Sequence, residues 1–338
     1  MLSSAAGARC AVSALDFENG ELVATVRTAL QDVEKILTIK MSGLEVLLGR
    51  KAPSVAHHTG VRLRPLFTVL AGQLGPRPNG PALVAAAAVI ELVHLATQFH
   101  GEVQDDCPGG NADARNSRRR ENDIAILAGD YLSAHASLLA STLGPDATRI
   151  VADTFAEVVT GQIRDKSGFQ SQDPVEHYLH VAREKAGSSI GASCRFGGVF
   201  SNLSTGQVEQ LARFGTTAGI VAHISDDIVA TSSLLSRKDT SAGTSLREHL
   251  HTLPALYAMR EGGAGAHRMS ELSTRRVVSN VDAENALEQL SLSRGMHLAK
   301  ATLRAYAGQA DAQLSALPRG YAVDALCRLV NHLVERGG

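Results

Sequence analysis

The chain has 338 residues, 44% of them hydrophobic, so it is long enough to bury a large core in one or two domains. Its 33 basic and 34 acidic residues leave a formal net charge of −1, which argues against a partner bound through a general basic field, such as a nucleic acid. The four cysteines, Cys10, Cys107, Cys194 and Cys327, have neither metal-site nor disulfide spacing, so a reduced, cytoplasmic protein is expected.

The N-terminal part of the chain carries no targeting signal that the sequence reveals. Residues 1–20 lack a charged region followed by a sustained apolar run, so no signal peptide is predicted. The most apolar stretch, residues 82–100, contains Glu91 and two histidines. These polar side chains favour a buried helix over a membrane span, and no transmembrane segment is expected.

The remaining segments predict helices. There is no sustained two-residue alternation and no regular series of hairpin signals. Residues 20–40 repeat apolar side chains along one helical stripe, namely Leu22, Val26, Leu30, Val33 and Leu37. Residues 60–75 predict a second helix with Pro65 near its start, and the Pro/Gly-rich residues 76–81 end it.

Residues 82–105 predict a helix that is apolar until its last turn, where Glu102, Asp105 and Asp106 gather. Residues three or four apart share a helix face, so Glu102 and Asp105 are expected on one side. The following residues 107–122 are glycine-rich and then arginine-rich, which predicts a surface loop.

Three further helices are expected over residues 124–144, 146–168 and 173–202. Asp146 is the predicted N-cap of the second of these. The pair Asp173-Pro174 is a helix-start signature, and Asn202 is expected in the turn that ends the third.

The next helix, from about residue 204, is apolar and presents the adjacent carboxylates Asp226 and Asp227. Residues 232–245 predict a polar connector, 245–261 a return to helix, and 261–268 a flexible stretch. Two or three more helices are expected from residue 283 onward. No linker or internal repeat divides the chain, so one all-α domain is predicted, a single large helical bundle.

The two apolar helices that present carboxylates suggest a deep apolar cavity with an acidic mouth. Hard cations such as Mg²⁺ take oxygen ligands and commonly bridge carboxylates to substrate phosphates. We therefore expect a diphosphate substrate held through Mg²⁺ at the mouth, with a hydrocarbon tail in the cavity. A solvated helix end is the plainer interpretation of Glu102, Asp105 and Asp106 taken alone.

Several segments resemble, in order and spacing, the motifs of the trans-isoprenyl diphosphate synthases, or polyprenyl synthetases. They are GVRLRPLF (60–67), IELVHLATQFHGEVQDD (90–106), AILAGDYL (125–132), VTGQIRD (159–165), EHYLHVAREKAG (176–187) and LREHLHTLPALYA (246–258). The resemblance implies the isoprenoid synthase fold, an all-α bundle around a deep central cavity. It would cover residues 16–338, after a loose extension over residues 1–15.

The family resemblance also implies an activity: Mg²⁺-dependent transfer of an allylic prenyl group, released from its diphosphate, to isopentenyl diphosphate. The partners implied are these two diphosphates and a second prenyl synthase subunit, as a homodimer or heterodimer. By position, the metal ligands would be Glu102, Asp105, Asp226 and Asp227; the catalytic residues Lys185, Asp226 and Asp227; and the substrate-binding residues Arg64, His94, Lys185 and Gln162.

The match to the family motifs is incomplete. Gly101 replaces the first acid of one Asp-rich motif, and Ala230 replaces the third acid of the other. Four diphosphate-binding cations are replaced by Val61, Gly110, Asn111 and Leu250. Each lost charged hydrogen bond costs about 1.5–3 kcal/mol, so reduced or selective activity is expected. The arginines Arg115, Arg118, Arg119 and Arg120 are the candidates to replace the missing cations.

Two alternatives remain beside the enzyme: a non-catalytic regulatory subunit of a hetero-oligomeric prenyl diphosphate synthase, and a prenyl-diphosphate-binding protein without turnover. The retained Arg64, Lys185 and Asp226–Asp227 pair favour the enzyme, whereas the lost cations favour the subunit. The small residues Ala96 and Thr97 above the first acids leave room for a longer product, but a weakened site favours early release and a short one.

Overall fold

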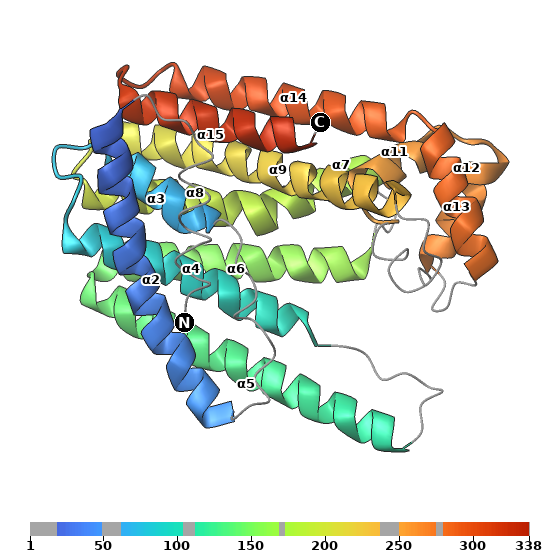
Figure 1. Ribbon diagram of the computed structural model, residues 1–338, viewed down its shortest axis with the longest axis horizontal. Helices are drawn as coiled ribbons and strands as arrows, with labels where there is room; N and C mark the ends of the chain where they lie inside the picture. Colours follow the sequence, from blue (N-terminus) through green and yellow to red (C-terminus); the bar gives the residue numbers. More distant parts are fainter. Residues whose placement is uncertain are drawn as a thin grey trace.

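The computed structural model describes residues 19–48, 62–103, 112–168, 173–236, 250–274 and 280–337. Every regular element in these ranges is a helix (Figure 1). In chain order they are α2 (Gly20–Leu48), α3 (Leu63–Gly72), α4 (Pro81–Gly101), α5 (Ala112–Thr142), α6 (Pro145–Ser167), α7 (Pro174–Ala182), the π-helical turn η3 (Arg183–Gly187), α8 (Ser188–Phe200), α9 (Thr205–Ser236), α11 (Leu253–Arg260), α12 (Gly263–Thr274), α13 (Asn280–Leu292), α14 (Gly295–Leu314) and α15 (Tyr321–Gly337). The predicted all-α class is confirmed.

The bundle is built around α8 and α9. Helix α8 packs against α9, α3 and α4, while α14 and α15 cover another side of α9. In Figure 1, α9, α14 and α15 run along the long axis, α2 crosses them at one end, and α12 and α13 cross at the other. The predicted extension over residues 1–15 lies outside the described residues, and the central cavity stays a prediction.

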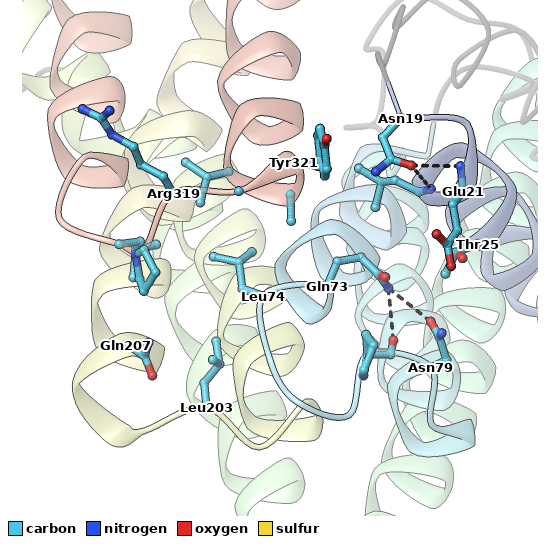
Figure 2. A pocket seen from close by; sticks show the side chains of 17 residues that line it. Asn19, Glu21, Thr25, Gln73, Leu74, Asn79, Leu203, Gln207, Arg319 and Tyr321 are labelled. Atoms are coloured by element: carbon cyan, nitrogen blue, oxygen red, sulfur yellow. Dashed lines mark hydrogen bonds between the residues drawn. The ribbon is translucent and has the colours of Figure 1, made fainter.

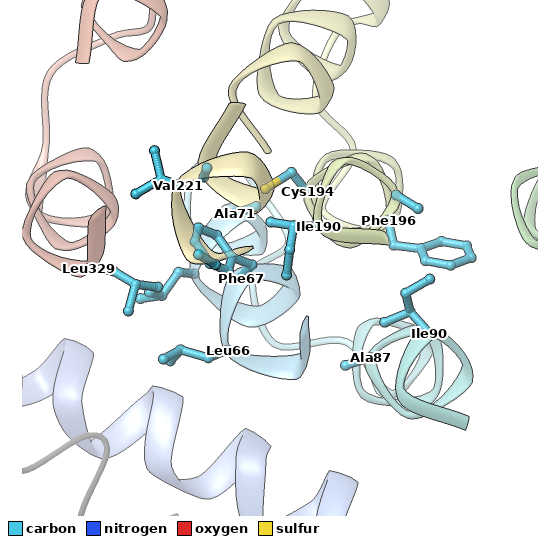
Figure 3. Packing of buried hydrophobic residues seen from close by; sticks show 14 of the residues in the cluster. Leu66, Phe67, Ala71, Ala87, Ile90, Ile190, Cys194, Phe196, Val221 and Leu329 are labelled. Atoms are coloured by element: carbon cyan, nitrogen blue, oxygen red, sulfur yellow. The ribbon is translucent and has the colours of Figure 1, made fainter. Parts of the chain in front are cut away.

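The core lies where α3, α4, α8, α9 and α15 meet (Figure 3). Phe67 of α3 stacks at an angle against Phe214 of α9, with ring centroids 6.1 Å apart. Figure 3 also shows Phe196 of α8 beside Ile90 of α4. Burying aromatic and branched side chains of this size contributes about 1.5–3 kcal/mol each, which makes this cluster the main source of stability.

Several local predictions are confirmed. In α2, Val26, Val33 and Leu37 are fully buried, as the apolar stripe predicts. Asp173 caps α7, because its Oδ1 accepts from the backbone N–H groups of Val175 (2.9 Å) and Glu176 (3.1 Å). The run through α7, η3 and α8 ends at a turn that contains Asn202, whose φ is +66°.

A seam of small residues lets α9 approach η3 and α8 closely. A Cβ placed on Gly219 of α9 would lie 2.4 Å from the carbonyl oxygen of Ala186, and one on Gly215 would lie 2.6 Å from that of Ile190. Real Cβ atoms do not approach backbone atoms this closely. Glycine at these positions therefore sets the distance between α9 and the turn that carries Lys185.

Three boundaries predicted from the sequence are wrong. The predicted loop over residues 107–122 is helical from Ala112, since alanine, arginine and glutamate favour a helix once the glycine pair has passed. The predicted flexible stretch 261–268 is largely the start of α12, whose Met269 and Leu272 are buried in a second, smaller core. Helix α6 begins at Pro145 after Gly144, so Asp146 lies in its first turn and is not the N-cap.

The first acidic helix is shorter than predicted. Helix α4 ends at Gly101, and Glu102 is its C-cap, with a backbone N–H that bonds to the carbonyls of Gln98 and Phe99. Glu102 therefore follows the helix instead of lying on its last turn. Asp105 and Asp106 lie outside the described residues.

Among the described residues, two helices are long and apolar enough to cross a membrane by length and composition. In α4, 72% of the apolar 18-residue stretch is buried inside the bundle, as expected for a core helix. In α5, only 33% is buried. An apolar face of α5 is thus left uncovered.

Candidate functional site

The two adjacent carboxylates of α9 have different surroundings. Asp226 is 64% exposed, and its Oδ1 forms an ion pair with Arg336 at the end of α15. Asp227 is partly buried, and its Oδ2 accepts from the Tyr178 hydroxyl (2.7 Å) and from the backbone N–H of Leu253 (3.2 Å). Asp226 is thus accessible from solvent, whereas one oxygen of Asp227 is already used to join α7 and α11 to α9.

Tyr178 is the buried neighbour of the carboxylates. Burial raises the pKa of its hydroxyl well above the ordinary value, and the negative charges of Asp227, Asp226 and Asp165 add to this. The hydroxyl therefore keeps its proton and remains a donor to Asp227. Burial also raises the pKa of Asp227, although the charge of His223 and the two hydrogen bonds oppose this shift.

Lys185 is carried by the π-helical turn η3, a rare geometry that is frequent at functional sites. Its Nζ lies 2.8 Å from Oδ2 of Asp165 on α6. Gly161, one turn earlier on α6, leaves space for this approach, since an added Cβ would lie 2.9 Å from Cγ of Lys185. The structure therefore brings Lys185 together with Asp165, whose charge in turn acts on Tyr178, the neighbour of Asp227.

Arg64, at the start of α3, lies near Asp226, one of the two adjacent carboxylates of α9. Its Nε donates to the Ser189 hydroxyl of α8. Burial lowers the pKa of the guanidinium, while the nearby carboxylates Glu91 and Asp226 oppose this effect. Within the described part of the chain its terminal nitrogens have no hydrogen-bond partner, so they are available to an anion.

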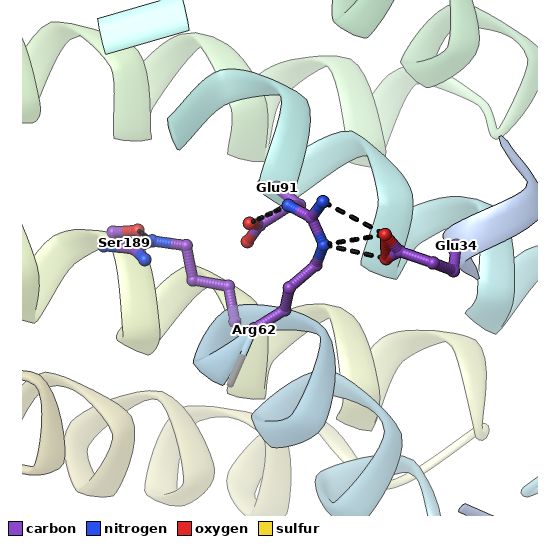
Figure 4. Close-up of polar contacts among 5 residues, drawn as sticks. Glu34, Arg62, Glu91 and Ser189 are labelled. Carbon is purple, nitrogen blue, oxygen red and sulfur yellow. Dashed lines mark hydrogen bonds and ion pairs between the residues drawn. The ribbon is translucent and has the colours of Figure 1, made fainter. Parts of the chain in front are cut away.

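Arg62, two residues earlier, is committed to the protein itself (Figure 4). Its guanidinium binds both oxygens of Glu34 on α2 (2.8 and 3.2 Å from Nε) and Oε1 of Glu91 on α4 (3.0 Å). Glu91 is only 4% exposed, and its Oε2 has no hydrogen-bond partner among the described residues. Since two carboxylates hold Arg62, this arginine is poorly placed to replace the cation missing at Val61.

Three other predicted residues, Gln162, His94 and Glu102, lie in the described part of the chain. The Gln162 amide nitrogen donates to the Thr97 carbonyl (2.9 Å), so this side chain joins α6 to α4 at the level of the small residues. His94 is partly buried on α4. Glu102 is exposed beyond the end of α4, and Asp105 lies outside the described residues.

The three predicted metal ligands that the structure describes, Glu102, Asp226 and Asp227, do not form one cluster. Among the described residues, no group of three or more His, Cys, Asp and Glu side chains lies close enough to hold a metal ion. Mg²⁺, however, is typically bound by one or two carboxylates together with water and substrate phosphates. The exposed carboxylate of Asp226 and the adjacent, partly buried carboxylate of Asp227 fit this type of site.

Two residues of the site were not predicted. Tyr178 lies inside the recognised segment 176–187, and its place four residues after Pro174 put it on a short amphipathic helix, so a buried position was foreseeable. Arg336 gave no local signal, because it meets Asp226 across 110 residues of sequence. The leucine at 250 has a clear structural role: it is 1% exposed and packs into the second core.

A separate cavity of about 400 Å³ lies at the other end of the bundle (Figure 2). It is lined by residues next to the N-terminal ends of α2, α4, α9 and α15, including Asn19, Asn79, Leu203 and Tyr321. Asp226 and Arg336 lie near the opposite ends of α9 and α15. This cavity is therefore not part of the carboxylate site.

This chain is similar to known proteins in both sequence and structure. The polyprenyl synthetase family model matches residues 46–290. Two relatives from Mycobacterium tuberculosis are a nonaprenyl diphosphate synthase, 40% identical over 97% of this chain and 98% of that protein, and a dimethylallyltranstransferase, 37% identical over 96% and 99%. The structure of the geranylgeranyl pyrophosphate synthase of Corynebacterium glutamicum complexed with calcium and isoprenyl diphosphate is also similar. Its TM-score is 0.80, its identity is 34%, and the match covers 96% of this chain and 99% of that one.

Proposed function

This chain belongs to the polyprenyl synthetase family and is a prenyltransferase, and from that premise we propose that it extends a short allylic diphosphate with isopentenyl diphosphate in a Mg²⁺-dependent reaction in the cytoplasm. The observation that supports this most is the placement of Asp226 and Asp227 beside Tyr178, within electrostatic reach of Arg64. A divalent cation needs carboxylate oxygens, and a diphosphate needs a cationic donor such as the guanidinium of Arg64.

Asp226 and Asp227 would hold the magnesium ion, with Glu102 and Asp105 contributing from the other motif. Bound there, the ion would neutralise the negative charge of the departing diphosphate. Tyr178 fixes one oxygen of Asp227 and leaves its other oxygen available. The similar Corynebacterium protein was crystallised as a complex with calcium and isoprenyl diphosphate, which supports a divalent ion as a partner of the substrate.

The cationic side chains would bind the diphosphates. Arg64 presents its terminal guanidinium nitrogens, which suit a phosphate because two parallel N–H bonds can form. Lys185 is bound to Asp165 and would exchange this partner for a phosphate oxygen. Since Arg62 is held by Glu34 and Glu91, it does not make up for the lost cation at Val61, and this supports the proposal of reduced activity.

A short product is supported by the packing of the bundle interior. Ile90 on α4 and Phe196 on α8 are both fully buried and lie side by side (Figure 3). Ile90 precedes Glu102 by 12 residues. At the helical rise this is about 18 Å below the acidic end of α4, where this pair would close the predicted cavity to a growing hydrocarbon chain. The same apolar walls would keep water away from an allylic cation.

An extension assay tests this function. The purified protein is incubated with dimethylallyl or geranyl diphosphate, labelled isopentenyl diphosphate and Mg²⁺, and the product is sized. We expect a labelled, extended product of short chain length that disappears when Mg²⁺ is removed by a chelator. If wild-type protein forms no more product than an Asp226→Ala/Asp227→Ala variant, the isolated chain is not an enzyme. A pull-down of another prenyl synthase would then favour the regulatory subunit.

The uncovered face of α5 supports association with a second copy of the chain. Leu127 and Leu138 are 60% and 61% exposed and, being 11 residues apart, share one face of the helix. Ile163 of the neighbouring α6 is 62% exposed. Exposed apolar side chains gathered on adjacent helices mark an interaction surface more often than isolated ones do, and dimers of a single chain are the commonest assembly.

Placing charges on this face should separate the subunits. We expect wild-type protein to run as a dimer in light scattering, and Leu127→Glu/Leu138→Glu to run as a monomer, because two carboxylates would be buried without partners. Leu292→Glu is the control, since Leu292 is 75% exposed on α13, away from α5. A double variant that remains dimeric would exclude this face as the interface.

A further inference from the structure

Three carboxylates of the described part of the site already have a partner inside the protein. Asp165 is paired with Lys185, Asp227 accepts from Tyr178 and from the Leu253 backbone, and Asp226 is paired with Arg336. A divalent cation that binds here must therefore compete with an existing contact. Asp226 is the carboxylate whose partner is a flexible, solvent-reachable cation, since the Arg336 side chain is 41% exposed.

The backbone that carries Arg336 is held firmly against α9. The Ser225 hydroxyl, one residue before Asp226, donates to the Leu333 carbonyl of α15 at 2.6 Å and is fully buried. A Cβ added to Gly337 would lie 2.9 Å from Cδ2 of Leu303 and 3.4 Å from Cα of Ser225. The last turn of α15 thus sits in contact with α9, and only the long side chain of Arg336 is free to turn away.

We propose that Arg336 is a resident cation on Asp226, which has to leave this carboxylate before a divalent ion can bind, so that the last turn of α15 sets the metal affinity of the site. This inference rests on the proposed function, because it takes Asp226 as a metal ligand. It assigns a role to a residue outside the recognised motifs. A guanidinium and a divalent ion both need the exposed oxygens of Asp226, and mutual repulsion of the two cations disfavours their sharing one carboxylate.

The contact also explains how the site can remain stable without a metal. Asp226 and Asp227 follow one another on α9, and the negative charge of Asp226 acts unfavourably on that of Asp227. Arg336 offsets this repulsion, and its position in the last turn of α15 is favourable for a positive charge because of the helix dipole. Removing the Arg336 side chain should leave both carboxylates in place, with less of their negative charge offset.

The test is Mg²⁺ binding to the full chain, measured by calorimetry in the absence of diphosphate and by the rise in melting temperature with added Mg²⁺. Arg336→Ala should bind Mg²⁺ about two- to fivefold more tightly than wild type. This increase equals the small contribution of an exposed ion pair, which the metal ion would no longer have to break. Arg336→Lys should lie between the two, because it keeps the charge but loses the forked geometry. In an Asp226→Asn background, Arg336→Ala should have no further effect.

Arg319→Ala is the matched control, since it also removes one arginine charge, just before the start of α15. Arg319 is about 25 Å from Arg336 along the helix, so salt screens its effect on Asp226. Unchanged or weaker Mg²⁺ binding by Arg336→Ala, in a protein whose wild type binds Mg²⁺, would overturn this inference and leave the proposed function standing. Wild-type protein that binds no Mg²⁺ and extends no substrate would overturn both.

Discussion

Asp226→Asn is expected to lower kcat/KM for extension by about 100-fold or more while leaving the melting temperature nearly unchanged. Loss of a group that only supports a metal ligand already costs about 10–100-fold in affinity or activity, and Asp226 is proposed as a ligand itself. The side chain is 64% exposed and makes one ion pair, so its charge contributes little to folding. The measurement is steady-state kinetics at saturating Mg²⁺ together with thermal denaturation.

The neighbouring Asp227 should behave differently. Asp227→Ala leaves the buried Tyr178 hydroxyl without an acceptor, which costs about 1–3 kcal/mol, so this variant should lose stability as well as activity. Asp227→Asn keeps an acceptor oxygen and should lose mainly activity. Asp153→Asn, at an exposed position on α6, is the control for both. Full activity in Asp226→Asn would contradict the assignment of this carboxylate to the metal site.

Gly219→Ala is expected to lower the free energy of unfolding by about 3 kcal/mol, the upper end of the range for overpacking a core. The added methyl group would lie 2.4 Å from the carbonyl oxygen of Ala186 and 2.8 Å from Cα of Gly187. Both are backbone atoms, so the strain is not relieved by turning a side chain. The η3 turn must move instead, and Lys185 moves with it, so activity should fall beyond the loss of folded protein.

Gly308→Ala provides the matched control in α14. A Cβ at Gly308 meets nothing within 4 Å, and the residue is exposed. Replacing glycine by alanine inside an open helix stabilises it by up to about 1 kcal/mol, so the same substitution should raise the melting temperature. Chemical denaturation of both variants measures the contrast. A Gly219→Ala protein as stable as wild type would show that η3 and α9 tolerate a wider separation.

The sequence by itself determined the all-α fold and the family, and its motifs predicted the site residues. Apolar side chains at helical spacing correctly predicted the buried stripe of α2. The Asp-Pro pair correctly predicted the start of α7. The start of α12 at Gly263 was missed because its helix depends on tertiary packing, in which Met269 and Leu272 are buried. The starts of α5 and α6 were missed because helix propensity after the glycine pair and Pro145 in the first turn outweighed the loop and cap signals.

Only the tertiary structure decided how the charges of the site are partnered. Asp226 meets Arg336 across 110 residues, Tyr178 meets Asp227 across 49, and Arg62 is drawn to Glu34 and Glu91 instead of to the substrate side. Pairing between charged side chains depends on distance and burial, which local sequence does not encode. The motifs therefore predicted which residues carry the chemistry, and the packing of α15, α7 and α2 against the bundle determined how their charged groups are partnered.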